Sequence, residues 1–299
     1  MSRSDITKTL AAFGCKIKEK EPMAAHTSFK IGGAADRFVC TTDLIQTALV
    51  LRYCNEQKIP LLVVGYGSNL LVSDDGIEGV VLRVEADDIR VDGTRMTVQA
   101  GASLKRVCLA ACEHGLSGLE FAYGIPGTMG GGVYMNAGAY GGQLSDVVRS
   151  ATVLNANGEL VELTAEQLKF GYRHSVLMEQ SLTVWSVTLE LQAADPDVVR
   201  CKMEEHMAAR KAKQPLEFPS GGSFFKRPEG YFAGALVEQC GFKGFTVGGA
   251  QVSEKHAGFV INRGGATCAD VMELCRQVQD KVKAAYGVDL EREVQLVGR

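Results

Sequence analysis

Residues 124–142 read GIPGTMGGGVYMNAGAYGG, and this segment decides how the rest of the chain is interpreted. It is rich in glycine, but apolar side chains such as Ile125, Val133 and Tyr140 are interleaved with the glycines. A flexible linker would instead be polar and rich in serine. We therefore expect a folded, buried segment whose backbone wraps closely around a flat or phosphorylated group. A packed glycine-rich turn without a ligand is the alternative.

A second glycine cluster, GYGSNLL at residues 65–71, follows an apolar run at 61–64 that predicts a short buried strand. Glycines in such a loop let backbone N–H groups approach a phosphate. The residues after it are strand-like rather than helical, which excludes a Rossmann fingerprint, and the chain contains no P-loop motif. Alone, this loop could be a structural turn. Two such clusters in one chain favour a nucleotide-type cofactor.

Composition narrows the class of protein. The 299 residues leave room for about two domains, and 46% hydrophobic with 22% charged residues excludes a disordered or fibrous chain. A net charge of −3 argues against nucleic acid as a partner. Nine scattered cysteines without a C-x-x-C pair predict free thiols, and no run is long and apolar enough for a membrane span or signal peptide. These two observations predict a cytoplasmic protein. The five histidines lack metal-ligand spacing, so we expect no metal site.

Periodicity and capping signals predict a mixture of helices and strands. Helices are expected at 43–57, from Ser103 to Gly115, at 198–213, and from the capping box Thr267-x-x-Asp270 to Gly287. Strands are expected at 61–64, 151–154, 160–163, 183–191 and 288–297, with Asn157-Gly158 as a hairpin turn. The order lacks a regular βαβ period, which favours an α+β fold. A composition shift at 193–197, AADPD, places a domain boundary between residues 194 and 195.

Six motifs occur together along the chain. They are HTSFKIGG at 26–33, the 65–71 loop, the segment from 125 to 141, GYR at 171–173, GSFFK at 222–226 and LEREV at 290–294. In this order, and from about residue 21 to residue 298, the sequence resembles the UDP-N-acetylenolpyruvoylglucosamine reductases, also called UDP-N-acetylmuramate dehydrogenases. Each motif is modest evidence, and their order and completeness carry the resemblance.

The resemblance implies a fold and a reaction. The fold is an FAD-binding domain of the vanillyl-alcohol-oxidase type at 1–194, made of two α+β lobes that divide near 75–80. An α+β substrate domain follows at 195–299, and its C-terminal strand returns toward the active site. The reaction is the NADPH-dependent reduction of the enolpyruvyl ether of a UDP-sugar, UDP-N-acetylglucosamine enolpyruvate, to UDP-N-acetylmuramate in peptidoglycan precursor synthesis. Neither glycine cluster contains a histidine, so FAD is expected to be bound without a covalent link.

The resemblance also implies the residues of the site. The expected FAD contacts are Gly65, Tyr66, Gly67, Ser68, Asn69, Leu70, Gly127, Thr128, Gly131, Asn136, Gly138 and Ala139. The expected substrate contacts are Tyr140, Tyr172, Arg210, Lys213, Gln214 and Lys226. Taken by themselves, these substrate residues could equally be ordinary surface or core positions.

Three residues match the catalytic positions of the family. Arg173 suits a carboxylate whose charge grows during hydride addition, because a guanidinium is planar and permanently charged. Ser223 matches the proton donor, a role in which a weak acid works only toward a strongly basic carbon. Glu293 matches the catalytic glutamate and is expected to share a proton, whereas Glu291 lies outside the motif position. Without the resemblance, the three would be interpreted as a surface arginine, a turn serine and a solvated carboxylate.

The sequence departs from the family at two positions and in one loop length. Lys30 stands where many relatives carry arginine, and Arg227 replaces an asparagine common in one branch. The short stretch from Ser223 to Gly244 points to the branch that lacks an extra substrate-covering loop. Two other functions stay open at this point: a flavin oxidase of the same fold, and a nucleotide-binding module without turnover.

Overall fold

The computed structural model describes residues 3–299 and divides into two compact units. The first comprises the residues up to 19, together with 37–66 and 79–209. The second comprises 20–36, 67–78 and 210–299. The predicted boundary at 194/195 lies just before helix α5 (Pro196–Lys213), whereas the units divide at 209/210, near the end of that helix. The division into compact units does not test the predicted domain boundary, which stays a prediction.

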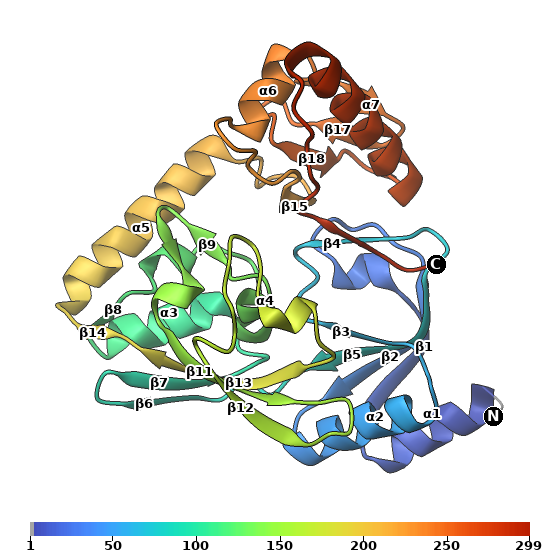
Figure 1. Cartoon of the computed structure of the whole chain (residues 1–299), viewed down its shortest axis with the longest axis vertical. Coiled ribbons are helices and arrows are strands. Elements are labelled where there is room, and N and C mark those ends of the chain that lie inside the picture. The colour runs from blue at the N-terminus through green and yellow to red at the C-terminus, as the bar shows by residue number, and fades with distance from the viewer. Residues whose placement is uncertain (1–2) are drawn as a thin grey trace. The chain divides into compact units, whose positions relative to one another are not determined.

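The first unit contains a five-stranded antiparallel sheet. Its order is β12 (Leu160–Thr164), β11 (Val148–Leu154), β13 (Thr183–Glu190), β7 (Arg95–Gln99) and β6 (Ile89–Asp92). Helices α3 (Leu104–Glu113) and α4 (Met129–Tyr134) lie on this sheet, as Figure 1 shows. Met96, Val107 and Val187 are among the buried side chains between these layers. The predicted Asn157-Gly158 hairpin is confirmed, with Leu154 opposite Leu160.

A smaller sheet has the order β1 (Lys16–Pro22), β2 (Ala34–Thr41), β5 (Ile77–Val84) and β3 (Leu61–Val64). Helices α1 (Arg3–Ala12) and α2 (Leu44–Glu56) supply side chains to its core, which includes Leu10, Val50 and Leu82. Asp43 caps α2 by accepting a 2.8 Å hydrogen bond from the Gln46 N–H. An Asp at the N-cap satisfies one of the N–H groups that the first helical turn leaves unbonded. The helix predicted at 43–57 and the strand predicted at 61–64 are confirmed as α2 and β3.

Short elements connect these layers. They are η1 (Met23–His26), β4 (Leu70–Val72), β8 (Leu116–Ser117), η2 (Glu120–Ala122), β9 (Gly138–Ala139), β10 (Gly142–Gln143), η3 (Leu144–Asp146), η4 (Val176–Met178) and β14 (Gln192–Ala193). The β9–β10 hairpin lies beside α5 in Figure 1. All nine cysteines are free thiols, as predicted, and five of them are buried. In residues 3–299, no helix has the length and apolar character needed to cross a membrane.

The second unit is built on a four-stranded antiparallel sheet and two helices. The sheet order is β15 (Ser220–Ser223), β18 (Phe259–Asn262), β17 (Ala250–Val252) and β16 (Thr246–Val247). Helices α6 (Ala233–Gln239) and α7 (Cys268–Tyr286) contribute to the same core, in which Val260, Leu274 and Val278 are buried. Thr267 and Asp270 form the predicted capping box, and Gly287 ends α7 with a φ of 70°. Both helix boundaries are thus set by local chemistry.

The predicted strand at 288–297 is largely wrong. Only β19 (Gln295–Val297) is a strand, and it pairs in parallel with β4. Before it, the chain makes one isolated bridge, between Arg292 and Phe225. Leu290 and Val294 are each 3% exposed, so they pack into the core without belonging to a ladder. Leu290 and Val294 are separated by an even number of residues, as buried residues on one face of a strand are, and this spacing led to the wrong prediction.

Candidate active site

The glycine-rich segment at 124–142 is folded, as predicted, but it contains a short helix that its composition does not indicate. The Thr128 hydroxyl caps α4 by accepting a hydrogen bond from the Gly131 N–H at 3.3 Å. The N–H groups of Met129 and Gly130 donate to the carbonyls of Ala102 and Ala100, at 2.8 and 2.9 Å. The Met129 and Gly130 amides therefore attach the segment to residues 100–102 of its own unit, whereas the Gly131 amide is used within the segment.

The two glycine clusters meet at one point inside the first unit. A Cβ on Gly65 would lie 2.5 Å from the Thr128 hydroxyl, which is closer than real Cβ atoms approach. Glycine at this position lets the backbone that follows β3 lie against the start of α4. The sequence predicted both clusters, but nothing in it indicated that Gly65 and Thr128 touch.

In the 65–71 loop, residues 67–71 belong to the second unit, where Gly67 contacts the 26–33 motif. Gly67 has a φ of +61°, and a Cβ on it would lie 2.2 Å from the His26 carbonyl oxygen. The Gly67 carbonyl accepts a hydrogen bond from the Ser28 N–H at 3.3 Å. Within residues 3–299, the N–H groups of Gly67 and Ser68 donate no hydrogen bond. The loop is thus braced by the 26–33 motif and presents two backbone donors.

Arg173 lies at the tip of a tight turn in the first unit. The turn is closed by hydrogen bonds between Gly171 and His174, at 3.0 Å and 3.3 Å. Arg173 has a φ of 54°, a left-handed conformation that is rare for a residue with a Cβ. Its Nη2 donates to the Gly138 carbonyl at 2.9 Å, and its guanidinium lies 5.2 Å from the centre of the Tyr172 ring. The structure therefore brings Arg173 to the second glycine cluster.

Three further non-glycine residues with positive φ lie in the first unit, on this turn's own segment or on the glycine-rich segment. Asn136 has a φ of 43°, Tyr140 a φ of 53° and Lys169 a φ of 46°. Backbone strain of this kind persists only where the surroundings enforce it, and it is concentrated at functional sites. The four strained residues therefore mark this region as a candidate site.

Tyr140 stacks on a residue that the sequence analysis did not select. Its ring is parallel to His206 of α5, with an interplanar angle of 8° and centres 4.5 Å apart. The pair joins the β9–β10 hairpin to α5, two elements that lie side by side in Figure 1. Tyr140 remains 46% exposed. No sequence signal links residue 140 to residue 206, because a stacking pair leaves no periodic pattern.

Ser223 and Glu293 come close together along the backbone of the second unit. The Glu293 N–H donates to the carbonyl of Phe224, the residue after Ser223, at 2.8 Å. Asn69 donates from its side chain to the Glu293 carbonyl at 3.0 Å. Ser223 is exposed, and a Cβ on the preceding Gly222, whose φ is +85°, would meet no atom within 4 Å. The serine therefore has open space beside its backbone.

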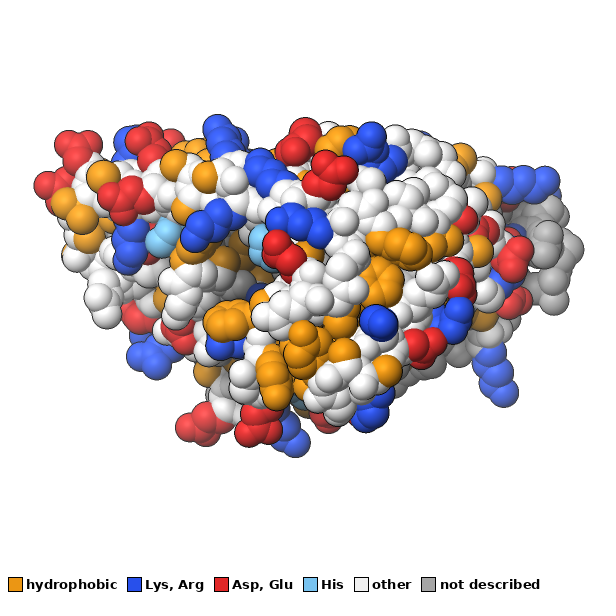
Figure 2. All heavy atoms as spheres, turned by 90° about the horizontal axis from the view of Figure 1, so that it is seen from above, with side chains coloured by type: hydrophobic (Ala, Val, Ile, Leu, Met, Phe, Trp, Pro, Cys, Tyr) orange, Lys and Arg blue, Asp and Glu red, His pale blue; other side chains and the backbone are white. Residues whose placement is uncertain are grey.

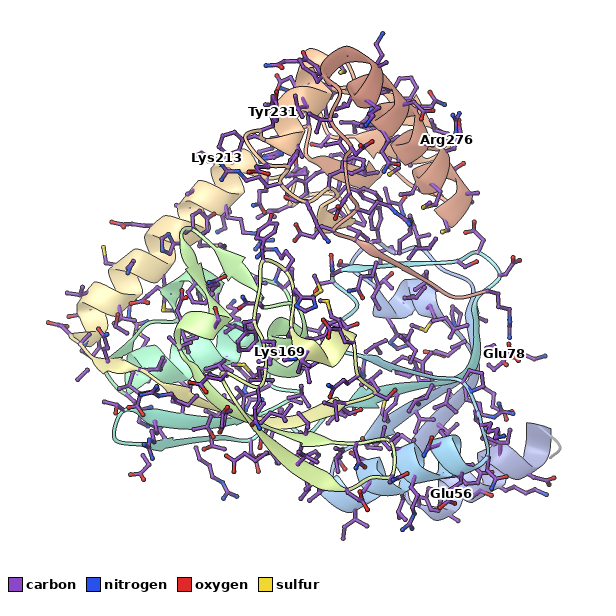
Figure 3. All side chains as sticks on the ribbon, viewed as in Figure 1. Glu56, Glu78, Lys169, Lys213, Tyr231 and Arg276 are labelled. Atoms are coloured by element: carbon purple, nitrogen blue, oxygen red, sulfur yellow. The ribbon has the colours of Figure 1, made fainter. Side chains whose placement is uncertain are left out.

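The expected substrate residues of the second unit lie on two segments. Lys213 ends α5 and is labelled in Figure 3; Arg210 precedes it by one helical turn. Gln214 follows, and its Oε1 is buried without a hydrogen-bond donor among the described residues. Lys226 forms a 3.1 Å ion pair with Glu291. The three cations suit recognition of an anion, whereas the Gln214 oxygen is an acceptor and suits a ligand that offers an N–H or O–H donor.

The surface charge does not by itself mark a binding site. On the face that Figure 2 displays, basic and acidic side chains are interspersed. The described residues contain no cluster of three or more His, Cys, Asp or Glu side chains arranged to hold a metal ion. Backbone donors at Gly67 and Ser68 and the closely packed Gly65 fit the predicted nucleotide cofactor.

Comparison with known proteins assigns the chain to families. Residues 35–164 match the model of an FAD binding domain, and residues 214–297 match the C-terminal domain of UDP-N-acetylenolpyruvoylglucosamine reductase. These matches confirm the predicted fold class, an FAD-binding domain of the vanillyl-alcohol-oxidase type followed by a C-terminal α+β domain.

Relatives of the same name match nearly the whole chain. The UDP-N-acetylenolpyruvoylglucosamine reductase of Lachnoclostridium phytofermentans is 49% identical, covering 95% of this chain and 93% of its own. That of Listeria monocytogenes is 47% identical, covering 94% and 95%. The crystal structure of the Thermus caldophilus reductase superposes with a TM-score of 0.82 at 32% identity, covering 94% of this chain and 98% of its own.

Proposed function

Because the chain belongs to the UDP-N-acetylenolpyruvoylglucosamine reductase family, we propose that it reduces the enolpyruvyl ether of UDP-N-acetylglucosamine enolpyruvate to UDP-N-acetylmuramate, with NADPH as the reductant. It is an FAD-dependent oxidoreductase of peptidoglycan precursor synthesis. We place it in the cytoplasm, since nine free thiols suit a reducing compartment.

The observation that carries this proposal is the position of Arg173. A strained arginine turn attached to the glycine-rich segment places a permanent cation beside the region proposed for the cofactor. Hydride addition to the enol ether leaves charge next to the substrate carboxylate. A guanidinium that is already in place stabilises this charge without reorganising during the reaction. Bound FAD supplies the hydride-transfer chemistry.

Ser223 and Glu293 are proposed to complete the reaction. The carbon next to the carboxylate must accept a proton, and Ser223 is the proposed donor, since its exposed hydroxyl adjoins the open side of Gly222. Glu293 is proposed to share a proton, on a backbone segment bonded to Phe224 and Asn69. A positioned acid of this kind contributes about 10²–10⁴-fold in rate.

We propose substrate contacts from Tyr140, Tyr172 and the cations at Arg210, Lys213 and Lys226, with Gln214 as an acceptor. A diphosphate carries negative charge that such cations can neutralise. Their proposed partner is the UDP moiety.

The test separates the two halves of the catalytic cycle. In Ser223→Ala, anaerobic NADPH should still bleach the flavin, whereas reoxidation by the enolpyruvyl substrate should slow by about 10²–10⁴-fold. Ser181→Ala, at an exposed serine that is not among the proposed site residues, is the matched control and should behave like the wild type. If NADPH leaves the wild-type flavin spectrum unchanged, or if small alcohols drive oxygen consumption without NADPH, the proposal is wrong.

A further inference from the structure

The turn that carries Arg173 needs support from outside itself. It is closed by two hydrogen bonds between Gly171 and His174, the second of which is long at 3.3 Å. Its left-handed arginine has a disfavoured backbone conformation that costs on the order of 1–3 kcal/mol. A turn with these properties would relax unless neighbouring groups held it.

Asn136 supplies one such hold. Its Nδ2 donates to the Gly171 carbonyl at 2.9 Å and lies within hydrogen-bond distance of Gln143 and Ser145. Its Oδ1 accepts from the Ser145 N–H at 2.9 Å. These partners fix the orientation of the Asn136 amide. The Gly171 carbonyl needs the donating NH₂ group, and the Ser145 N–H needs the accepting oxygen. The residue is 1% exposed, so its polar atoms are directed to the protein.

Ser175 supplies a second hold on the other side of the arginine. Its hydroxyl donates to the Tyr134 carbonyl at 2.7 Å, and the residue is fully buried. The turn is therefore attached to the segment 134–136 both before and after Arg173. The arginine itself adds a third bond, to the Gly138 carbonyl.

We propose that Asn136 is a positioning residue that holds the Arg173 turn in its reactive geometry, rather than a side chain that contacts the cofactor. Asparagine is suited to this position because it tolerates the left-handed φ of 43° better than most residues. The inference rests on the proposed function for the role of Arg173. The hold on the turn itself stands on the hydrogen bonds alone.

The experiment is a double-mutant cycle between Asn136→Gly and Arg173→Ala. Glycine accepts the backbone conformation and removes only the amide. Asn136→Gly should keep its flavin and slow substrate-driven reoxidation by about 10²-fold, the usual effect of a displacement of about 1 Å at a reacting centre. In the Arg173→Ala background the same change should cost less than about 3-fold, because the group it positions is already gone. Losses that multiply in the double variant would overturn the proposal.

A readout independent of activity measures the hold directly. Amide hydrogen exchange at residues 171–175 should accelerate in Asn136→Gly and, by removal of the second anchor, in Ser175→Ala. The matched control is Asn155→Gly, since Asn155 braces the β11–β12 turn by accepting from the N–H groups of Asn157 and Glu159. The control should leave exchange at 171–175 and hydride transfer unchanged.

The two measurements separate the possible failures. Unchanged exchange at 171–175 in Asn136→Gly and Ser175→Ala would overturn the inference whatever the activity. Loss of bound flavin in Asn136→Gly with normal exchange would also overturn it, and would instead assign the side chain to the cofactor. If wild-type protein transfers no hydride to the enolpyruvyl substrate, the proposed function fails. Accelerated exchange would then still support the hold on the turn.

Discussion

Gly67 is the glycine at which replacement should be most informative. In Gly67→Ala two separate costs arise. A left-handed φ of +61° costs a residue with a Cβ about 1–2 kcal/mol. The new Cβ would also lie 2.2 Å from the His26 carbonyl oxygen and 3.0 Å from the Thr27 Cα. Relieving this contact requires a movement of packed backbone, which adds about 1–3 kcal/mol. The total is about 2–5 kcal/mol.

Gly241→Ala is the matched control for the first cost alone. Gly241 has a φ of +80° and would place its Cβ where no atom lies within 4 Å. It belongs to the same unit as Gly67. The control should therefore lose only the conformational contribution of about 1–2 kcal/mol. The difference between the two variants measures the contact with His26.

The assay is thermal unfolding of the apoprotein, followed by circular dichroism, so that bound FAD does not alter the melting temperature. A loss of 1 kcal/mol lowers Tm by about 2–4 °C in proteins of about this size. Gly67→Ala should therefore melt several degrees below Gly241→Ala, and it should also retain less FAD after purification. Equal melting temperatures in the two variants would refute the close-contact reasoning.

Three further predictions concern stability and reactivity. Burial alone would raise the pKa of Glu120, but hydrogen bonds from Ser117 and from backbone N–H groups hold that pKa below its usual value of 4.5. The stabilisation by this carboxylate is present above that value and is lost as the pH falls through the lower, folded value, so Tm should fall less on acidification in Glu120→Gln; a parallel fall would count against it. Cys201 is exposed, whereas burial raises the pKa of thiols such as Cys108, so a maleimide should label Cys201 first in the native protein, and mass spectrometry that finds Cys108 labelled as early would contradict this. Asp74 accepts hydrogen bonds from two N–H groups at the start of α7, so Asp74→Ala should lose about 1–2 kcal/mol in a denaturant titration, and an unchanged midpoint would contradict the capping role.

Local signals in the sequence predicted helices α2, α3, α5 and α7 and strands β3, β11, β12 and β13. The helix start at Ser103, the Asn157-Gly158 hairpin and the capping box of Thr267 and Asp270 all appear where they were expected. Each of these signals acts between residues that are near neighbours in the chain. Their chemistry can therefore be inferred without knowledge of the fold.

Features that depend on distant partners could not be predicted in this way. Helix α4 forms in a run of glycines, which are poor helix formers, because Thr128 caps it and because its first amides bond to residues 100 and 102. The pairing of β19 with β4 joins the second and the third of the three sequence segments that make up the second unit. The bond from Asn136 to Gly171 likewise joins two separate motifs. The family resemblance selected Arg173 and Asn136, but it did not indicate that one holds the turn of the other.

The parallel pairing of β19 with β4 has a consequence for synthesis on the ribosome. Residues 70–72 are translated more than 200 residues before their partner strand at 295–297. The residues of the first unit are complete at residue 209, so this unit can fold while the ribosome is still translating the second. A chain that stops before residue 295 would leave β4 without its partner. The loop that begins at Gly67 therefore reaches its final form only after residues 295–297 have left the ribosome.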